Sequence, residues 1–125
     1  MDIQDNNIRK VGVERILNFT RHTINLLLPN DTTITIPMDG MIRVANSREV
    51  VEKLLFKDNE IKVNKTTFGN AIGLPPEREG TIIIVSTLAA KALKDRDDIY
   101  VIDEPVREGQ LVLGCRALAK GSEVS

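Results

Sequence analysis

The chain has 125 residues, of which 42% are hydrophobic and 28% are charged, and its formal net charge is −1. This length fits one domain with its own core. The charge disfavours binding to genomic nucleic acid, which needs many Lys and Arg side chains on one face. Cys115 is the only cysteine, which excludes an internal disulfide and suits a reducing compartment. No apolar run reaches the roughly 20 residues that span a bilayer, so we expect a cytoplasmic protein without membrane contact.

The first predicted element with regular structure is a β-hairpin. Residues 1–14 include Gly12 and only a few apolar side chains, so we expect an N-terminal arm or a weak helix there. Residues 24–28 are mostly apolar, and residues 32–38 alternate hydroxyl and apolar side chains with the period of two that marks a half-buried strand. Residues 29–31 between them, Pro-Asn-Asp, are typical of a turn.

The next segment, residues 41–56, fits two structures. Its valines and leucines form either a helical stripe or one side of a long, irregular strand. The turn at residues 57–60 and the alternating residues 61–68 behind it favour a second hairpin. We expect its second strand to stop at Gly69.

A change from strand to helix is predicted at Ser86. Residues 82–85 are four consecutive β-branched apolar residues, which suit a central strand buried on both faces. Residues 87–94 are rich in Ala and Leu and favour a short helix, with the Ser86 hydroxyl as its N-cap. Two further strands are predicted at residues 99–103 and 111–119.

Together these elements predict an α+β, β-rich fold. We expect a mostly antiparallel or barrel-like sheet, one short helix near residues 87–94, and the N-terminal arm or weak helix over residues 1–14. Residues 15–120 contain no repeat and no long linker, so they should form a single domain. Residues 121–125 should be a frayed tail.

The catalytic and metal-binding possibilities depend on His22, the only histidine. No serine elbow and no pair of His or Cys at ligand spacing accompanies it, so we expect no metal site and no cofactor. Residues 69–73 contain glycines but lack the Gly-Lys-Ser/Thr ending of a phosphate-binding loop. An enzyme would need His22 as a general acid or base beside Asp97 or Asp103. The alternative is a histidine hydrogen-bonded within the fold.

Three arginines stand at predicted element ends, namely Arg21, Arg96 and Arg116. Guanidinium groups from separate segments can converge on one anion through bidentate hydrogen bonds. Taken singly, each arginine equally suits a solvated surface charge or an ordinary salt bridge.

An aromatic ring is placed beside two hydroxyls in the segment Thr66, Thr67 and Phe68. Such a group can stack a base and hydrogen-bond a ribose or phosphate. The alternative for Phe68 is a core position.

Several short motifs occur in a recognisable order. They are Asn-x-Thr-x-His-x-Ile at 18–24, TTFG at 66–69, GLP at 73–75, GTIIIVS at 80–86, RDD at 96–98, Asp103, and GCRALA at 114–119. In this order they resemble a family of small proteins found in phages and prophages of bacteria and archaea. Members of that family commonly carry Asn-Leu-Thr-Pro-His-x-Ile, so Arg21 stands where proline is usual. The resemblance implies a small phage protein of β-rich fold and no established enzymatic activity.

Small phage proteins of this class include sponges, which sequester nucleotide immune signals. By this analogy the chain is a phage-encoded anti-defence protein of the host cytoplasm. It would bind a nucleotide-derived signal, of the cyclic nucleotide or cyclic ADP-ribose type, without cleaving it. Its pocket would form between copies in a homo-oligomer. The alternatives are a structural, virion-accessory or partner-binding module and a nucleotide-processing enzyme that uses His22. The candidate ligand-binding residues are Asn18, Thr20, Arg21, His22, Thr66, Thr67, Phe68, Ser86, Arg96, Asp103 and Arg116.

Overall fold

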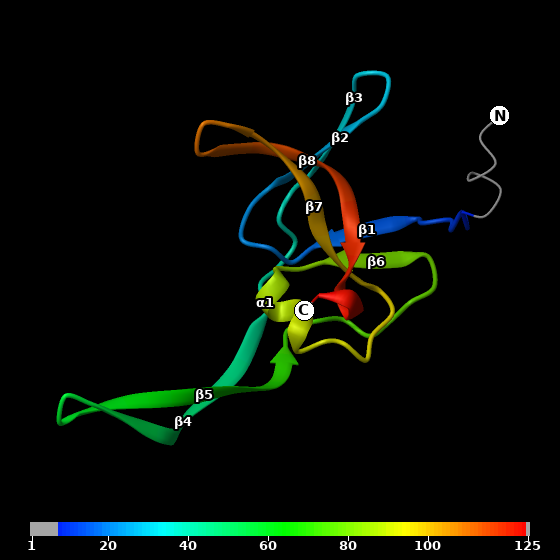
Figure 1. Cartoon of the computed structure of the whole chain (residues 1–125). Coiled ribbons are helices and arrows are strands. Elements are labelled where there is room, and N and C mark those ends of the chain that lie inside the picture. Colours follow the sequence, from blue (N-terminus) through cyan, green and yellow to red (C-terminus); the bar gives the residue numbers. More distant parts are fainter. Residues whose placement is uncertain (1–7, 125) are drawn as a thin grey trace.

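Most of the chain is arranged as two β-sheets, with one short α-helix (Figure 1). We describe a computed structural model, which covers residues 8–124 and, at residues 44–46 and 68–72, the backbone alone. One sheet has six strands in the order β1-β6-β7-β8-β2-β3, and the other is the pair β4-β5. This confirms the β-rich fold predicted from the sequence. The elements are β1 (Arg15–Asn18), β2 (Ile24–Leu28), β3 (Thr32–Ile36), β4 (Arg43–Phe56), β5 (Asn59–Ile72), β6 (Thr81–Ile84), α1 (Thr87–Lys91), β7 (Ile99–Glu108) and β8 (Leu111–Lys120).

The six-stranded sheet is mixed and curls into a nearly closed barrel. Strands β7–β8 and β2–β3 pair antiparallel, whereas β1–β6, β6–β7 and β8–β2 pair parallel. The two edge strands, β1 and β3, approach each other at Asn18, whose side-chain amide donates to the Ile36 carbonyl at 3.0 Å. The Asp39 backbone N–H donates to the Asn18 carbonyl at 2.8 Å. One buried asparagine therefore joins the two edges of the sheet.

Both predicted hairpins are present, and each closes through two residues with positive φ. These are Asn30 and Asp31, with φ of 64° and 58°, and Lys57 and Asp58, with φ of 51° and 63°. Such turns match the right-handed twist of the flanking strands. The ambiguous segment 41–56 is strand from Arg43 onward. Its partner β5 does not stop at Gly69 as expected, because pairing with β4 continues to Ile72.

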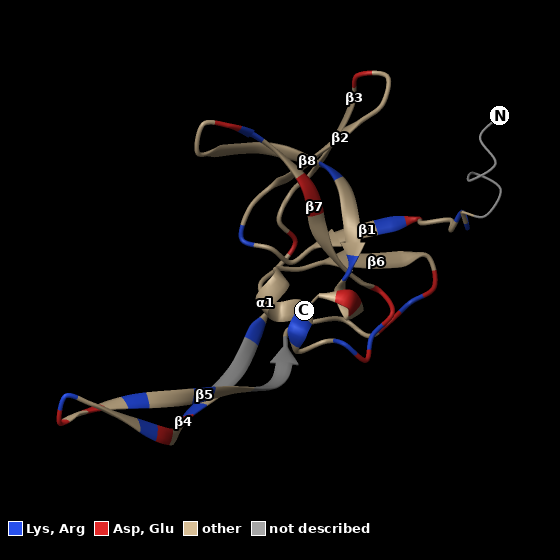
Figure 2. Cartoon of the chain, viewed as in Figure 1, with Lys and Arg blue, Asp and Glu red and all other residues tan. Residues whose placement is uncertain are grey.

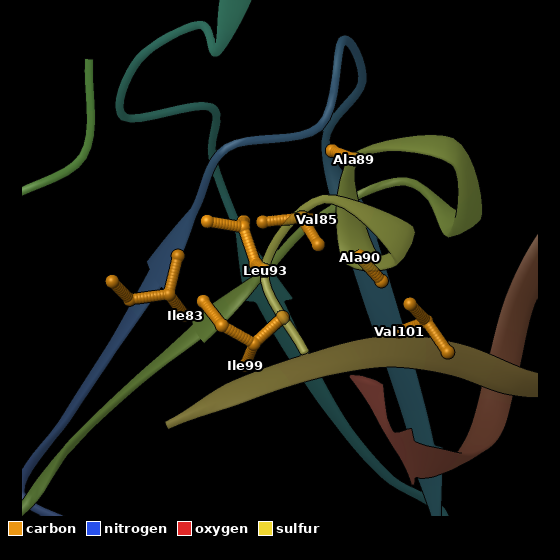
Figure 3. Close-up of a cluster of buried hydrophobic side chains, with 7 residues drawn as sticks. All are labelled: Ile83, Val85, Ala89, Ala90, Leu93, Ile99 and Val101. Carbon is orange, nitrogen blue, oxygen red and sulfur yellow. The ribbon is translucent and has the colours of Figure 1, made fainter. Parts of the chain in front are cut away.

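Two clusters of buried side chains lie on opposite faces of the six-stranded sheet. Ile83 and Ile84 of β6 are both 0% exposed, and successive residues of a strand point to opposite faces. The prediction of a strand buried on both faces is therefore confirmed. Ile83 belongs to the cluster beneath α1, which Figure 3 shows, with Val85, Ala89, Ala90, Leu93, Ile99 and Val101. Ile84 belongs to the other cluster, with Ile24, Leu26, Ile36 and Cys115. Burial raises the pKa of the Cys115 thiol above its ordinary value.

The helix α1 is shorter than the sequence predicts. It begins after Ser86, whose Oγ accepts a hydrogen bond from the Ala89 backbone N–H at 3.1 Å, so the predicted N-cap is confirmed. It ends at Lys91 rather than at residue 94. The Ala92 and Leu93 N–H groups donate to carbonyls three residues back, which tightens the chain into a turn.

The two ends of the described chain are an N-terminal segment without helix and a short C-terminal 3₁₀ helix. Of the two structures expected for the N-terminal segment, arm or weak helix, residues 8–14 show the arm, because they contain no helix. Residues 1–7 lie outside the described residues. Residues 121–124 are not frayed as expected, because Gly121–Glu123 forms a 3₁₀ helix and Val124 packs against the cluster beneath α1; Ser125 lies outside the described residues. Gly121 lies so close to β7 that an added Cβ would be 2.6 Å from Cγ2 of Ile99. Within residues 8–124, no helix has the length and apolar character needed to cross a bilayer.

Candidate functional site

A cleft of about 1060 Å³ opens beside α1. Its walls come from the loop between β1 and β2, the residues that lead into β4, the junction of β6 with α1, and the first half of β7. These segments are far apart in the sequence and meet only in the folded chain. The lining residues are Phe19, Thr20, Arg21, His22, Met41, Ile42, Arg43, Val85, Ser86, Thr87, Leu88, Ala89, Val101 and Ile102.

The cleft combines an apolar floor with a basic rim. Val85 and Val101 are buried at its base. Arg21, His22 and Arg43 are exposed. The lining includes no Asp or Glu among the described residues, and neither Arg21 nor Arg43 forms an ion pair with a described residue. Two guanidinium groups without a carboxylate partner make this end of the barrel suited to a ligand that carries negative charge.

Asn18 holds the loop that carries the basic rim. Its side chain is 0% exposed, and its Nδ2 donates to the carbonyls of His22 at 2.8 Å and Ile36 at 3.0 Å. Its Oδ1 accepts from the Thr20 backbone N–H at 2.9 Å and from the Thr20 hydroxyl at 2.6 Å. Both donors and both acceptor positions of this amide are therefore used inside the chain. Asn18 and Thr20 act in this structure as supports for Arg21 and His22.

Ser86 brings a hydroxyl to the opposite wall of the cleft. Its Oγ accepts the capping hydrogen bond from Ala89, and the hydroxyl proton takes no part in that bond. The Ser86 side chain is exposed at the edge of the cleft. It can therefore donate to a ribose or phosphate oxygen while it continues to cap α1.

Several other predicted site residues do not line this cleft. Thr66 and Thr67 are exposed on β5, and the Phe68 side chain lies outside the described residues. Asp103 is exposed on β7, where its Oδ1 accepts from the Glu104 backbone N–H at 2.9 Å, and Arg116 is exposed on β8. The structure thus brings together Thr20, Arg21, His22 and Ser86.

Arg96 lies outside the cleft in an ion pair of its own. Its Nε donates to Oδ1 of Asp98 at 3.0 Å and its Nη2 donates to Oδ2 at 2.7 Å. The same Nη2 donates to the Pro75 carbonyl at 2.9 Å, which ties two loops together. The hydrogen bonds to Asp98 raise the pKa of the guanidinium above its ordinary value, although burial opposes them. These contacts give Arg96 a structural role.

Arg96→Ala is expected to lower the free energy of unfolding by about 2 kcal/mol, because it leaves the buried Asp98 carboxylate without its partner. Arg116→Ala is the matched control, since Arg116 is exposed and forms no ion pair with a described residue; its effect should stay within about 0.5 kcal/mol. Denaturant titration at neutral pH measures both values. Equal effects of the two variants would contradict the structural role of Arg96.

The described residues do not assemble a catalytic pair around His22. Asp97 lines a second cleft, of about 640 Å³, together with Arg9, Tyr100 and Lys120, whereas Asp103 lines neither cleft. A general acid–base pair needs its members within hydrogen-bond reach or one water apart. No group of three His, Cys, Asp or Glu side chains in the described part of the chain could hold a metal ion. Neither Asp97 nor Asp103 lines the first cleft with His22.

Arg43 is the site residue that the sequence does not reveal. It is the first residue of β4, in a segment whose sequence fits helix or strand, and no neighbouring motif marks it. Only the arrangement of β4 beside the loop of residues 19–23 brings it to the rim near Arg21.

Comparison with known proteins does not identify the chain. No family model, no curated protein and no solved structure matches it.

Proposed function

We propose that the chain binds a nucleotide-type anion in the cleft beside α1 and releases it unchanged. The observation that carries this proposal is a rim with Arg21, His22 and Arg43, without a described carboxylate, above an apolar floor. A guanidinium group pairs with a phosphate through two parallel hydrogen bonds, and an apolar surface covers a base. A simple inorganic anion would use the rim and leave the floor without a function.

The size of the cleft agrees with a ligand of this class. Pockets for small organic ligands commonly measure about 300–1000 Å³ and combine apolar walls with a few polar groups. The cleft, at about 1060 Å³, stands at the upper end of this range. Phe19, Met41 and Leu88 supply apolar area to its walls, and Ser86 supplies a hydroxyl. A cyclic nucleotide or a cyclic ADP-ribose type of molecule has both parts that such a site recognises.

The specific form of the proposal is a phage-encoded sponge that sequesters a nucleotide immune signal. The resemblance of motifs at residues 18–24 and 80–86 to small phage proteins supports the phage origin. A site that holds phosphate with Arg21 and Arg43 but has no described acid–base partner for His22 suits capture better than turnover. This form of the proposal explains why two arginines and a histidine line one cleft that has no described carboxylate, in a chain of net charge −1.

Binding should weaken by roughly tenfold to a hundredfold when Arg21 or Arg43 is replaced by alanine, because each loses charge-assisted hydrogen bonds to phosphate. His22→Gln retains a hydrogen-bonding group and should keep most of the affinity. Arg107→Ala is the matched control, since Arg107 is an exposed arginine that does not line the cleft. Calorimetry against cyclic nucleotides, cyclic ADP-ribose isomers and linear dinucleotides measures these affinities.

The same panel separates capture from turnover. After incubation, heat denaturation and chromatography, a sponge returns the ligand intact, whereas an enzyme returns products. Products that disappear in His22→Gln would establish the enzyme and contradict capture. If the unaltered chain binds no nucleotide, the proposal fails, and a partner-binding module becomes the better supported function. One observation already favours that module, namely the exposed apolar side chains of β4 and β5.

A further inference from the structure

The β4–β5 ribbon projects from the barrel as a long two-stranded arm (Figure 1). Each strand has 14 residues, which corresponds to a length of about 46 Å at the usual rise per residue. Among the described residues, each of these strands packs extensively only against the other. Isolated two-stranded ribbons are marginally stable in water unless a further element covers one face. We therefore expect one face of the ribbon to be covered by a further structural element.

The register of the ribbon defines one apolar face. Directly opposed residues of an antiparallel pair lie on the same face, and the ladder opposes Leu54 to Ile61, Phe56 to Asn59 and Glu52 to Val63. Because residues 59, 61 and 63 alternate along β5, all of these side chains share one face. We call Leu54, Phe56, Ile61 and Val63 the apolar face of the ribbon. Leu54 is 50% exposed, Phe56 61% and Ile61 48%, so much of this apolar area is in contact with water.

The other face of the same segment carries three charged side chains and one apolar side chain, that of Leu55. It carries the opposed pair Lys53 and Lys62 and the opposed pair Leu55 and Glu60. Lys53 Nζ lies 3.4 Å from Glu60 Oε2, in an ion pair that remains exposed to solvent. Figure 2 shows charges of both signs along this part of the ribbon. Because apolar side chains adjoin one another on one side of the ribbon and charges predominate on the other, a partner is expected to cover the apolar face.

We propose that the apolar face is a self-association surface, covered by the same face of a second copy with the two ribbons antiparallel. A two-fold axis through the Leu54–Ile61 pair places this pair over its own copy. The same axis places Phe56 over Glu52 of the second copy and beside its Val63. The contact is isologous: Leu54 and Ile61 of each ribbon cover the same two residues of the other, and Phe56 and Val63 flank them.

Charge complementarity identifies the occupant as a second copy of this chain. In this arrangement the tip residue Lys57 of one ribbon reaches Glu49 and Glu52 of the other. Both carboxylates lie on the same side of the ribbon as the apolar face, because the ladder opposes them to Lys65 and Val63. The Lys57 ammonium is on that face too, 5.3 Å from the centre of the Phe56 ring. The two-fold axis repeats these contacts, so each tip meets Glu52, which has no cation opposite it, and Glu49, which is opposed to Lys65.

The overlapping halves of two such ribbons form a small contact. Contacts well below about 1200 Å² are typical of weak or transient association. We therefore expect a dimer that forms reversibly as the chain concentration rises into the micromolar range. This inference does not rest on the proposed function, because none of the apolar-face residues lines the cleft beside α1.

Sedimentation of the full chain from about 5 to 500 µM tests the proposal across the range expected for a weak contact. The unaltered chain should shift from monomer to dimer, and Ile61→Lys should remain a monomer throughout. Leu55→Lys is the matched control, because Leu55 is even more exposed, at 78%, but lies on the other face; it should dimerise like the unaltered chain. Thermal melting of all variants verifies that the barrel stays folded.

A charge exchange tests the orientation of the two ribbons. Lys57→Glu should weaken dimerisation at least tenfold, and the addition of Glu49→Lys and Glu52→Lys in the same chain should restore it. A monomer at every concentration, a dimer that survives Ile61→Lys, or equal dissociation by Leu55→Lys would overturn the interface. Failure of the exchange to restore the dimer would overturn the antiparallel arrangement.

Discussion

Replacement of Ile83 by alanine should lower the free energy of unfolding by about 3–4 kcal/mol, among the largest losses expected for a single apolar side chain of the described residues. Ile83 is 0% exposed on β6, in the cluster with Val85, Ile99 and Val101 beneath α1 (Figure 3). Truncation removes three carbon atoms from a site closed by two neighbouring strands and a helix. The resulting cavity collapses poorly, because close-packed backbone surrounds it.

Denaturant titration measures this loss, and Ile34→Ala provides the comparison. Ile34 is also an isoleucine in a strand, but it is 43% exposed on the edge strand β3. Its truncation should cost less than about 1 kcal/mol, since little buried area is lost. If Ile83→Ala is as mild as Ile34→Ala, the cluster beneath α1 is not the main source of stability.

Replacement of Asn18 by alanine should cost about 2–4 kcal/mol, although the residue is polar and small. The change removes the side-chain donor to the buried carbonyl of Ile36 and one of the two donors to the carbonyl of His22, which keeps the Thr20 hydroxyl. The Thr20 N–H loses its acceptor at the same time. Buried polar groups without partners carry their full desolvation penalty. Denaturant titration again measures the loss.

Two further variants sharpen this test. Asn18→Asp keeps the shape but replaces a donating NH₂ by an accepting oxygen, so it should be at least as destabilising as alanine. Asn25→Ala is the control, because the Asn25 side chain also bonds to a strand carbonyl and a threonine hydroxyl, but these two hydrogen bonds are exposed to solvent. Its cost should stay within about 0.5 kcal/mol. A mild effect of all three variants would contradict the role of Asn18 in joining β1 to β3.

Asn18 connects the stability of the barrel to the proposed site. The same amide that joins the sheet edges shapes the loop of Thr20, Arg21 and His22. We therefore expect Asn18 variants to lose ligand affinity even at temperatures where they remain folded. A variant at Ile83 that is still folded should retain affinity, because Ile83 does not line the cleft.

The elements with strong local signals follow from the sequence alone. The turn at Asn30–Asp31 predicts the first hairpin, because few other residues accept positive φ. The β-branched run at residues 82–85 predicts a strand buried on both faces, and Ser86 marks the start of α1. Each of these signals acts over a few residues, between side chains and the backbone next to them.

The sequence predicts secondary structure less well where pairing between distant segments determines it. The four residues of β1 are too few to show a period, and they become a strand only because β6 accepts them as a parallel neighbour. β5 passes Gly69 because β4 continues opposite to it. Local preference at these positions is weak, so the hydrogen bonds of the partner strand determine the conformation.

The candidate site shows the same division between local and tertiary information. Residue type alone marks Arg21 and His22 as able to bind an anion, and their motif lies next to a strand. Only the tertiary structure places Arg43 at the same rim and assigns Arg96 to Asp98 instead. An arginine side chain carries the same charge wherever it stands. Its function depends on which groups the folded backbone brings within hydrogen-bond distance, and that is set by long-range strand pairing.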